Sequence, residues 1–154
     1  MKYRLLKQEE LEGLKDEFVQ FLIVNGIEAD HWNTLKTEQN EKAQGIIVSF
    51  SDFILESILN KARYLEFFSG NTLLAFKCNP SEIELAGIEG KRDYISIEEL
   101  MKDFVDNPER FTGFKQKKEY QPERNMELFN MLESGAVITD HILFDYMDTV
   151  IIDD

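Results

Sequence analysis

Three things are scarce in this sequence: cysteine, basic side chains and long apolar runs. The single cysteine, Cys78, excludes an intramolecular disulfide framework and a cysteine-rich zinc module. Only 17 Lys and Arg stand against 30 Asp and Glu, for a formal net charge of −13. That balance argues against a general nucleic-acid binder, because binding to phosphates needs cations that displace counterions. The 8 glycines are dispersed, which excludes a glycine-rich loop that holds a phosphate.

The longest apolar stretch is too short for a membrane span. Residues 45–56 include charged side chains and fall short of the roughly 20 apolar residues that cross a bilayer. The N-terminal residues turn acidic before an apolar signal-peptide core can form. We therefore expect a cytoplasmic protein that does not bind membranes, in a compartment where a free thiol is common.

The sequence does contain enough apolar material for a folded core. Hydrophobic residues make up 43% of the 154, and 12 of them are Phe. This content excludes a disordered acidic tail, because such chains lack the apolar surface that offsets the entropy lost on ordering. A chain of this length buries roughly 68–70% of the surface that it exposes when unfolded. We expect a single acidic domain over residues 1–154.

The first part of the chain has the periodicity of helices. Residues 8–25 place apolar side chains at helical spacing, and Gly26 follows as a common helix stop. Asp30 is expected to cap a short helix. A long helix is expected over residues 41–63, and it is apolar around most of its circumference over residues 46–59. Such a helix lies either at the centre of a fold or against a partner chain, so we expect that the protein can form a homodimer.

The middle of the chain has the pattern of strands. Two short runs, Tyr64–Phe68 and Thr72–Lys77, flank a turn at Gly70 and predict a hairpin. Residues 81–88 alternate polar and apolar side chains and predict a third strand. We therefore expect a small antiparallel sheet from about residue 64 to residue 94.

Helix signals return in the last third of the chain. Ser96 begins a capping-box motif, and Pro122 suits the first turn of a further helix. Thr139 or Asp140 is expected to cap a final helix, whereas residues 111–120 fit either a strand or a loop. Together these signals predict an α+β fold with N-terminal helices, a small antiparallel sheet in the middle and C-terminal helices packed on it.

No catalytic, cofactor-binding or metal-binding residue is assigned from the sequence. Glu28 and His31 have the Glu-x-x-His spacing of di-iron bundles, but these need two such motifs, and His141 has no Glu three residues before it. Asp52 and Glu56 share one face of the long helix, and we interpret them as its solvent edge. The alternative is a small acid–base or metal-dependent enzyme that uses these two carboxylates, with one of the two histidines.

Acidic charge is concentrated at the C-terminal end. Residues 125–154 hold no Lys or Arg and seven acidic side chains: Glu127, Glu133, Asp140, Asp145, Asp148, Asp153 and Asp154. A basic segment, 110–124, lies just before them. Two interpretations are open: the acids pair internally with this segment, or they form a docking surface for a basic protein partner. A third is that the chain mimics nucleic acid and inhibits a basic protein.

Several segments of the sequence carry a resemblance to other proteins. They are Met1–Arg4, Phe18–Leu22, Trp32, Tyr64–Ser69, Phe76–Asn79, Glu123–Asn125 and Leu132–Ala136. Through them nearly the whole chain resembles an uncharacterised family of short bacterial proteins, a domain of unknown function. The resemblance implies no activity, cofactor or catalytic residue. Because no catalytic constellation is assembled and the C-terminal acids lack local partners, we expect a non-catalytic cytosolic interaction or regulatory protein.

Overall fold

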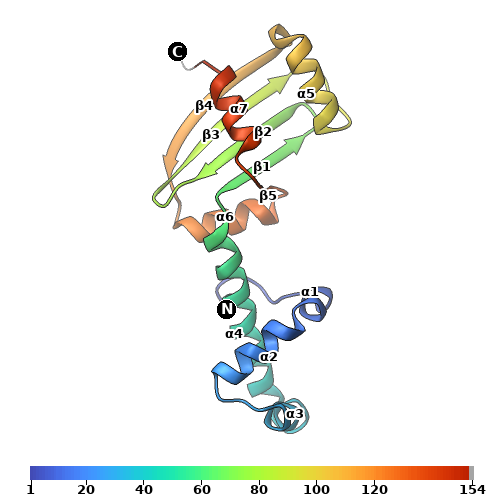
Figure 1. Ribbon diagram of the computed structural model, residues 1–154, viewed down its shortest axis with the longest axis vertical. Coiled ribbons are helices and arrows are strands. Elements are labelled where there is room, and N and C mark those ends of the chain that lie inside the picture. Colours follow the sequence, from blue (N-terminus) through green and yellow to red (C-terminus); the bar gives the residue numbers. More distant parts are fainter. Residues whose placement is uncertain (153–154) are drawn as a thin grey trace. The chain divides into compact units, whose positions relative to one another are not determined.

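A computed structural model describes residues 1–152 of the chain (Figure 1). These residues form seven α-helices, one 3-10 turn and a five-stranded sheet, so the fold is α+β, as the sequence predicted. The chain divides into two compact units, Met1–Ile58 and Leu59–Asp154, and the boundary falls within one helix. Each unit has its own hydrophobic core. The expectation of one domain over residues 1–154 stays a prediction.

The first unit consists of helices. They are α1 (Gln8–Gly13), α2 (Lys15–Val24), α3 (Ala29–Glu38) and most of α4 (Asn40–Lys61). The core gathers buried Leu6, Phe50, Ile54 and Leu55, and partly buried side chains of α1 and α2 pack against it. The long α4 confirms the helix predicted over residues 41–63.

Two local predictions for this unit were wrong. Residues 8–25 do not form one helix, because the chain breaks at Leu14, whose φ of −117° and ψ of 27° lie outside helical values. The preceding Gly13 explains the weak point, since glycine inside a helix costs roughly 1 kcal/mol relative to alanine. Asp30 does not cap α3, because Glu28 occupies the N-cap position. Asp30 lies instead in the first turn, where a carboxylate interacts favourably with the helix dipole.

The second unit is built on an antiparallel sheet. Its strands are β1 (Tyr64–Ser69), β2 (Thr72–Cys78), β3 (Glu82–Gly90), β4 (Phe111–Glu119) and β5 (Val137–Thr139), in the order β4-β3-β2-β1-β5. The predicted hairpin between β1 and β2 is confirmed, with Gly70 at φ +65°, a value that favours glycine. The predicted extent of the sheet was too small, since β4 and β5 add an edge strand on each side.

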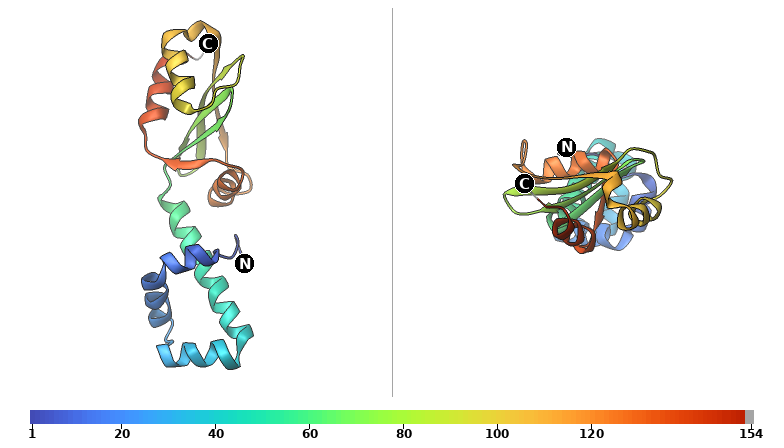
Figure 2. Two further views of the ribbon diagram at one scale, coloured as in Figure 1. Left: turned by 90° about the vertical axis from the view of Figure 1, so that its right-hand side faces the viewer. Right: turned by 90° about the horizontal axis from the view of Figure 1, so that it is seen from above.

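Helices cover the sheet unequally. Helices α5 (Ile97–Asp106) and α7 (Ile142–Val150) lie on one face, over the alternating side chains that include the paired Leu73 and Ile88 (Figure 1). Helix α6 (Arg124–Glu133) lies on the other side of the sheet (Figure 2). The remaining element is the 3-10 turn η1 (Pro108–Arg110), which leads into β4.

The ends of these helices test the capping predictions. Ser96 caps α5 as expected, because its hydroxyl accepts a hydrogen bond from the Glu99 backbone at 3.1 Å. The expected cap of α7 at Thr139 or Asp140 was wrong, because His141 occupies the N-cap position and Thr139 belongs to β5. Asp140 lies just before the N-cap, where its carboxylate accepts a hydrogen bond from the backbone N–H of Ile142 at 3.0 Å. Pro122 is not in the first turn of α6, which begins two residues later.

Arg124, the first residue of α6, joins three parts of the second unit. Its guanidinium donates to the carbonyls of Leu59 at 2.8 Å and of Ala62, at the end of α4. It also donates to the carbonyls of Cys78 at 3.4 Å and Asn79 at 3.3 Å, where β2 ends. The last carbonyls of a helix lack the usual donors within the helix, so an arginine side chain that reaches them adds charged hydrogen bonds where the helix ends.

Candidate interaction surface

Helix α2 is apolar on every side over its second half. From Phe18 to Val24 six of seven side chains are apolar, and seven residues make nearly two full turns. Yet Leu22 is the only residue of α2 that is buried. Val19, Ile23 and Val24 are 50%, 60% and 82% exposed. A helix that is apolar all round is normally covered all round, so α2 is an exception within the part of the chain that the structure describes.

One groove runs between α2 and α4. We call it the α2–α4 groove, and it has a volume of about 600 Å³ and is lined by Asp16, Glu17, Gln20, Phe21, Val24, Asn25 and Phe53. The rings of Phe21 and Phe53 lie 5.7 Å apart, and Phe53 remains 56% exposed. Asp16 and Glu17, in the first turn of α2, supply two carboxylates to the wall. The groove therefore combines an aromatic floor with negative charge.

A second groove lies on the α3 side of α2. It encloses about 450 Å³, and its lining is almost entirely apolar: Leu11, Lys15, Phe18, Val19, Leu22, Ile23, Ile27, Ala29, Trp32, Asn33 and Ile47. Phe18 meets Trp32 edge to face at 5.1 Å and meets Phe50 at 4.9 Å. These contacts connect the groove to the core of the unit. Several of its side chains therefore already hold α2 and α3 in place.

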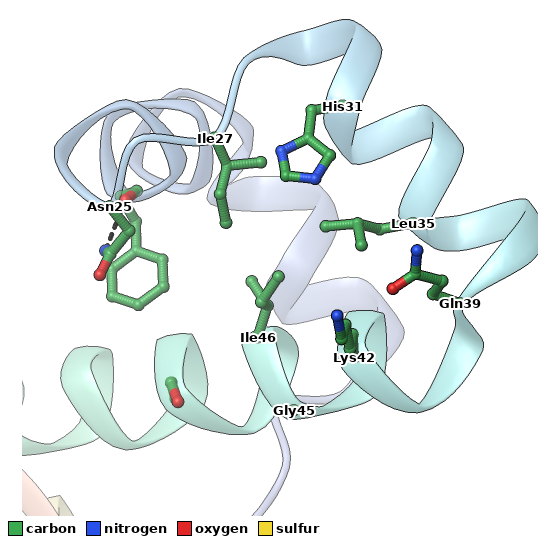
Figure 3. A pocket seen from close by; sticks show the side chains of 10 residues that line it. Asn25, Ile27, His31, Leu35, Gln39, Lys42, Gly45 and Ile46 are labelled. Carbon is green, nitrogen blue, oxygen red and sulfur yellow. Dashed lines mark hydrogen bonds between the residues drawn. The ribbon is translucent and has the colours of Figure 1, made fainter.

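A third cavity, the α3–α4 pocket, lies beside α3 and has a different chemistry (Figure 3). Its volume is about 510 Å³, and it is lined by Phe21, Asn25, Ile27, His31, Leu35, Gln39, Lys42, Gly45, Ile46 and Ser49. Half of these residues carry a polar side chain. In Figure 3 Lys42 and Ile46 rise from α4 toward His31 and Leu35 of α3.

Asp52 and Glu56 hold the N-terminal residues against α4. The Asp52 carboxylate accepts from the backbone N–H of Lys2 at 2.8 Å and of Tyr3 at 3.1 Å. Glu56 pairs with the Lys2 ammonium at 3.4 Å and accepts a hydrogen bond from the Tyr3 hydroxyl. Burial, together with this bond to Glu56, raises the pKa of Tyr3 to about 12. The pair is thus not simply the solvent edge of α4, because residues 2–3 lie on it.

The two histidines proposed as partners of these carboxylates have other recorded neighbours. His31 lines the α3–α4 pocket, whose lining includes neither Asp52 nor Glu56. In the second unit His141 contacts Asp145 through a ring nitrogen at 2.9 Å. Within residues 1–152 there is also no group of three or more His, Cys, Asp or Glu side chains that could hold a metal ion. The enzyme alternative stays a prediction.

The C-terminal acids are partly engaged inside the second unit. Glu127 contacts Lys118 at 2.6 Å and accepts from the Gln121 backbone, and Asp148 contacts Lys115 at 3.1 Å. Two residues of the basic segment 110–124 therefore pair with the acidic region, which supports internal pairing at these positions. Two further basic residues of this segment have acidic partners outside the acidic region. Lys117 pairs with Glu84, and Arg110 pairs with Asp103.

The remaining acids of that region have other surroundings. Asp140 accepts a hydrogen bond from the Ile142 backbone, Asp145 contacts His141, and Glu133 is an exposed residue at the end of α6. Asp153 and Asp154 lie outside the described residues. An acidic docking surface in this region stays a prediction, with less unpaired charge than the sequence alone indicates.

Cys78 is a buried residue at the end of β2. It is 2% exposed, and burial raises the pKa of its thiol to about 11. The thiol is therefore protonated at neutral pH, and a protonated thiol is a poor nucleophile.

No helix among residues 1–152 is long and apolar enough to cross a membrane.

The sequence contained a signal for the surface on α2. The amphipathic pattern predicted for residues 8–25 rests on Leu11, Leu14, Phe18, Phe21 and Leu22. It leaves out Val19, Ile23 and Val24, which are the side chains that the structure exposes. Apolar residues that do not fit the predicted buried face were thus the available indication of the exposed apolar surface on α2.

Comparison with known proteins places the chain in a family. Neither the curated proteins nor the solved structures contain a match to it. One family, described as a family of unknown function (DUF6495), matches residues 1–152. The resemblance to an uncharacterised family is therefore confirmed, and the chain belongs to DUF6495.

Proposed function

We propose that this protein is a non-catalytic interaction protein that binds a basic amphipathic helix of a partner protein in the α2–α4 groove. The observation that carries the proposal is the exposure of α2, a helix apolar on every side of its second half. Burial of an apolar side chain stabilises a complex by roughly 1.5–3 kcal/mol when it goes from fully exposed to fully buried. In the groove, Val24 and Phe53 are 82% and 56% exposed, so their apolar surface is available for burial by a partner.

Charge supports a basic occupant. Residues 1–58 hold 11 acidic and 6 basic side chains, and two of the acids, Asp16 and Glu17, line the groove itself. A second copy of this chain would bring the same negative charge to the groove, which disfavours it as the occupant. A partner helix that has large apolar side chains such as Leu on one face, with Lys or Arg beside them, complements both the aromatic floor and the acidic wall of the groove.

The proposal is tested with two designed peptides. The first is a fluorescein-labelled amphipathic helix of about 18 residues, five turns, with Leu on one face and Lys on the other. The second has Glu in place of Lys. We expect the Lys peptide to bind with a Kd on the order of 10 µM, measured by fluorescence anisotropy, and the Glu peptide to bind at least about tenfold more weakly.

A matched pair of variants locates the binding. Phe53→Ala is expected to weaken binding of the Lys peptide about tenfold, because the ring forms the floor of the groove. Ile58→Ala removes another exposed apolar side chain of α4, which does not line the groove, and should leave the affinity unchanged. Equal affinity for the two peptides, or equal affinity of the two variants, would contradict the proposal. So would a stable dimer in sedimentation that excludes the Lys peptide.

A further inference from the structure

The α3–α4 pocket differs from both grooves beside α2 because polar side chains make up half of its lining and none of them is a carboxylate. Lys42 and His31 come from different helices, and the neutral Gln39 and Ser49 also border the cavity. The surrounding unit is acidic overall, with 11 acidic and 6 basic side chains in residues 1–58. The lining of this pocket, by contrast, contains Lys42 and His31 and no carboxylate. Its polar side is therefore suited to an anion.

Neither basic side chain is used within the unit. Among residues 1–152 Lys42 and His31 have no ion pair or hydrogen bond, and both side chains are exposed. Among the polar side chains that line the pocket, Asn25 does have a partner, because its amide donates to the Phe21 carbonyl at 2.7 Å. An ammonium, an imidazole, an amide and a hydroxyl are thus available to a bound molecule. Ammonium groups and N–H donors are the groups that hold carboxylates.

Apolar side chains also line the pocket. They are Ile27, Leu35 and Ile46, which lie among the polar side chains, and Leu35 is only 4% exposed (Figure 3). Gly45 adds to the available space, because a Cβ at this position would meet no atom within 4 Å. A cavity of about 510 Å³ lies within the range of small-molecule sites, which are mostly apolar with a few polar groups that orient the ligand.

We propose that the α3–α4 pocket binds a small amphipathic carboxylate. The carboxylate lies between Lys42 and His31, and a short alkyl or aryl body lies on Ile27 and Ile46. Phe21 and Asn25 border both this pocket and the α2–α4 groove, but none of the four residues assigned here to the ligand lines the groove. The inference is therefore a second binding function of the helical unit and does not depend on the first. The ligand carries one negative charge and an apolar body of a few carbons, which distinguishes it from a phosphate or a free metal ion.

Three probes separate the charge from the apolar body. Octanoate has both, octan-1-ol has only the body and acetate has only the charge. We expect octanoate to bind with a Kd on the order of 1 mM, in a titration followed by ¹H–¹⁵N chemical shifts of the full chain. The shifted amides should include Gly45 and Ile46. Octan-1-ol and acetate should bind at least about tenfold more weakly, as each lacks one of the two contacts.

Variants test the assigned contacts. Lys42→Gln should weaken octanoate binding about fivefold to tenfold, whereas Lys36→Gln, a matched change on α3 outside the pocket, should not change it. Gly45→Leu should abolish binding by filling the cavity, and it keeps the helix because leucine is a better helix former than glycine. Unchanged helical circular dichroism would show that the fold is retained.

Several outcomes would overturn the inference. They are equal binding of octanol and octanoate, no effect of Lys42→Gln, or retained binding in Gly45→Leu. Shifts confined to Val24 and the region of Phe53 would place the ligand in the α2–α4 groove and would equally contradict it. Phe53→Ala should leave octanoate binding unchanged, so that failure of this inference and failure of the proposed function are distinguishable.

Discussion

Replacing Arg124 with methionine is expected to lower the free energy of unfolding of the second unit by at least about 3 kcal/mol. The guanidinium donates to four backbone carbonyls: those of Leu59 and Ala62 at the end of α4, and those of Cys78 and Asn79 after β2. Methionine keeps much of the side-chain length but removes every donor. The carbonyls of Leu59, Ala62 and Asn79 keep a second donor. A hydrogen bond to a charged group nevertheless contributes about 1.5–3 kcal/mol, so the loss of several such bonds outweighs the small gain in apolar volume.

The matched control for this prediction is Arg110→Met. Arg110 pairs with Asp103 at 3.2 Å and its side chain is 60% exposed, so its loss should cost less than about 1 kcal/mol. Urea denaturation followed by circular dichroism measures both variants against the natural sequence. The role assigned to Arg124 is wrong if its replacement costs no more than that of Arg110.

Phe50→Ala is expected to destabilise the helical unit by about 3–5 kcal/mol. Phe50 is fully buried, and its ring meets Phe18 at 4.9 Å and Phe21 at 5.3 Å. Both of these rings belong to α2, so Phe50 is a buried contact between α2 and α4. Its truncation leaves a cavity at that contact, and the loss includes both the transferred apolar surface and the unfilled volume.

Phe53→Ala is the control, one turn further along the same helix. Because Phe53 is 56% exposed, its truncation should cost less than about 1 kcal/mol. The two variants should therefore separate stability from binding: Phe50→Ala lowers the thermal midpoint, and Phe53→Ala retains it but loses affinity for the Lys peptide. Similar melting temperatures for the two variants would show that the core of the unit has been wrongly assigned.

The sequence predicted those elements whose signals are local. The hairpin around Gly70 and the cap at Ser96 depend on residues within a few positions of each other, and both are present. The long helix was also predicted, since its apolar run extends over several turns. The prediction failed at Leu14, where Gly13 weakens a periodic pattern that otherwise continues.

Features that depend on distant contacts were not predicted. Strand β4 was ambiguous in the sequence because Phe111–Glu119 contains three lysines, and its pairing with β3 decides its structure. Arg124 contacts residues up to 65 positions away, so its partners are defined only by the fold. Asp52 and Glu56 were interpreted as a solvent edge because nothing in their own helix indicates that Lys2 and Tyr3 return to them.

The same reasoning separates the two candidate interaction surfaces. The acidic C-terminal region was suggested by composition, which does not show that Glu127 and Asp148 have internal lysine partners. The surface on α2 is suggested by exposure, which composition does not give. The partner helix that we propose for the α2–α4 groove would cover Val24 and Phe53, two of the apolar side chains that the fold leaves exposed.

Hydrogen exchange with the Lys peptide bound tests this account most directly. Ligand binding slows exchange at the site by stabilising the closed state of the helices that it contacts. We predict slower exchange in Lys15–Val24 and in the part of α4 around Phe53, with no change in residues 127–152. Slower exchange in residues 127–152 and none in α2 would contradict the account and would place the binding surface on the C-terminal acids.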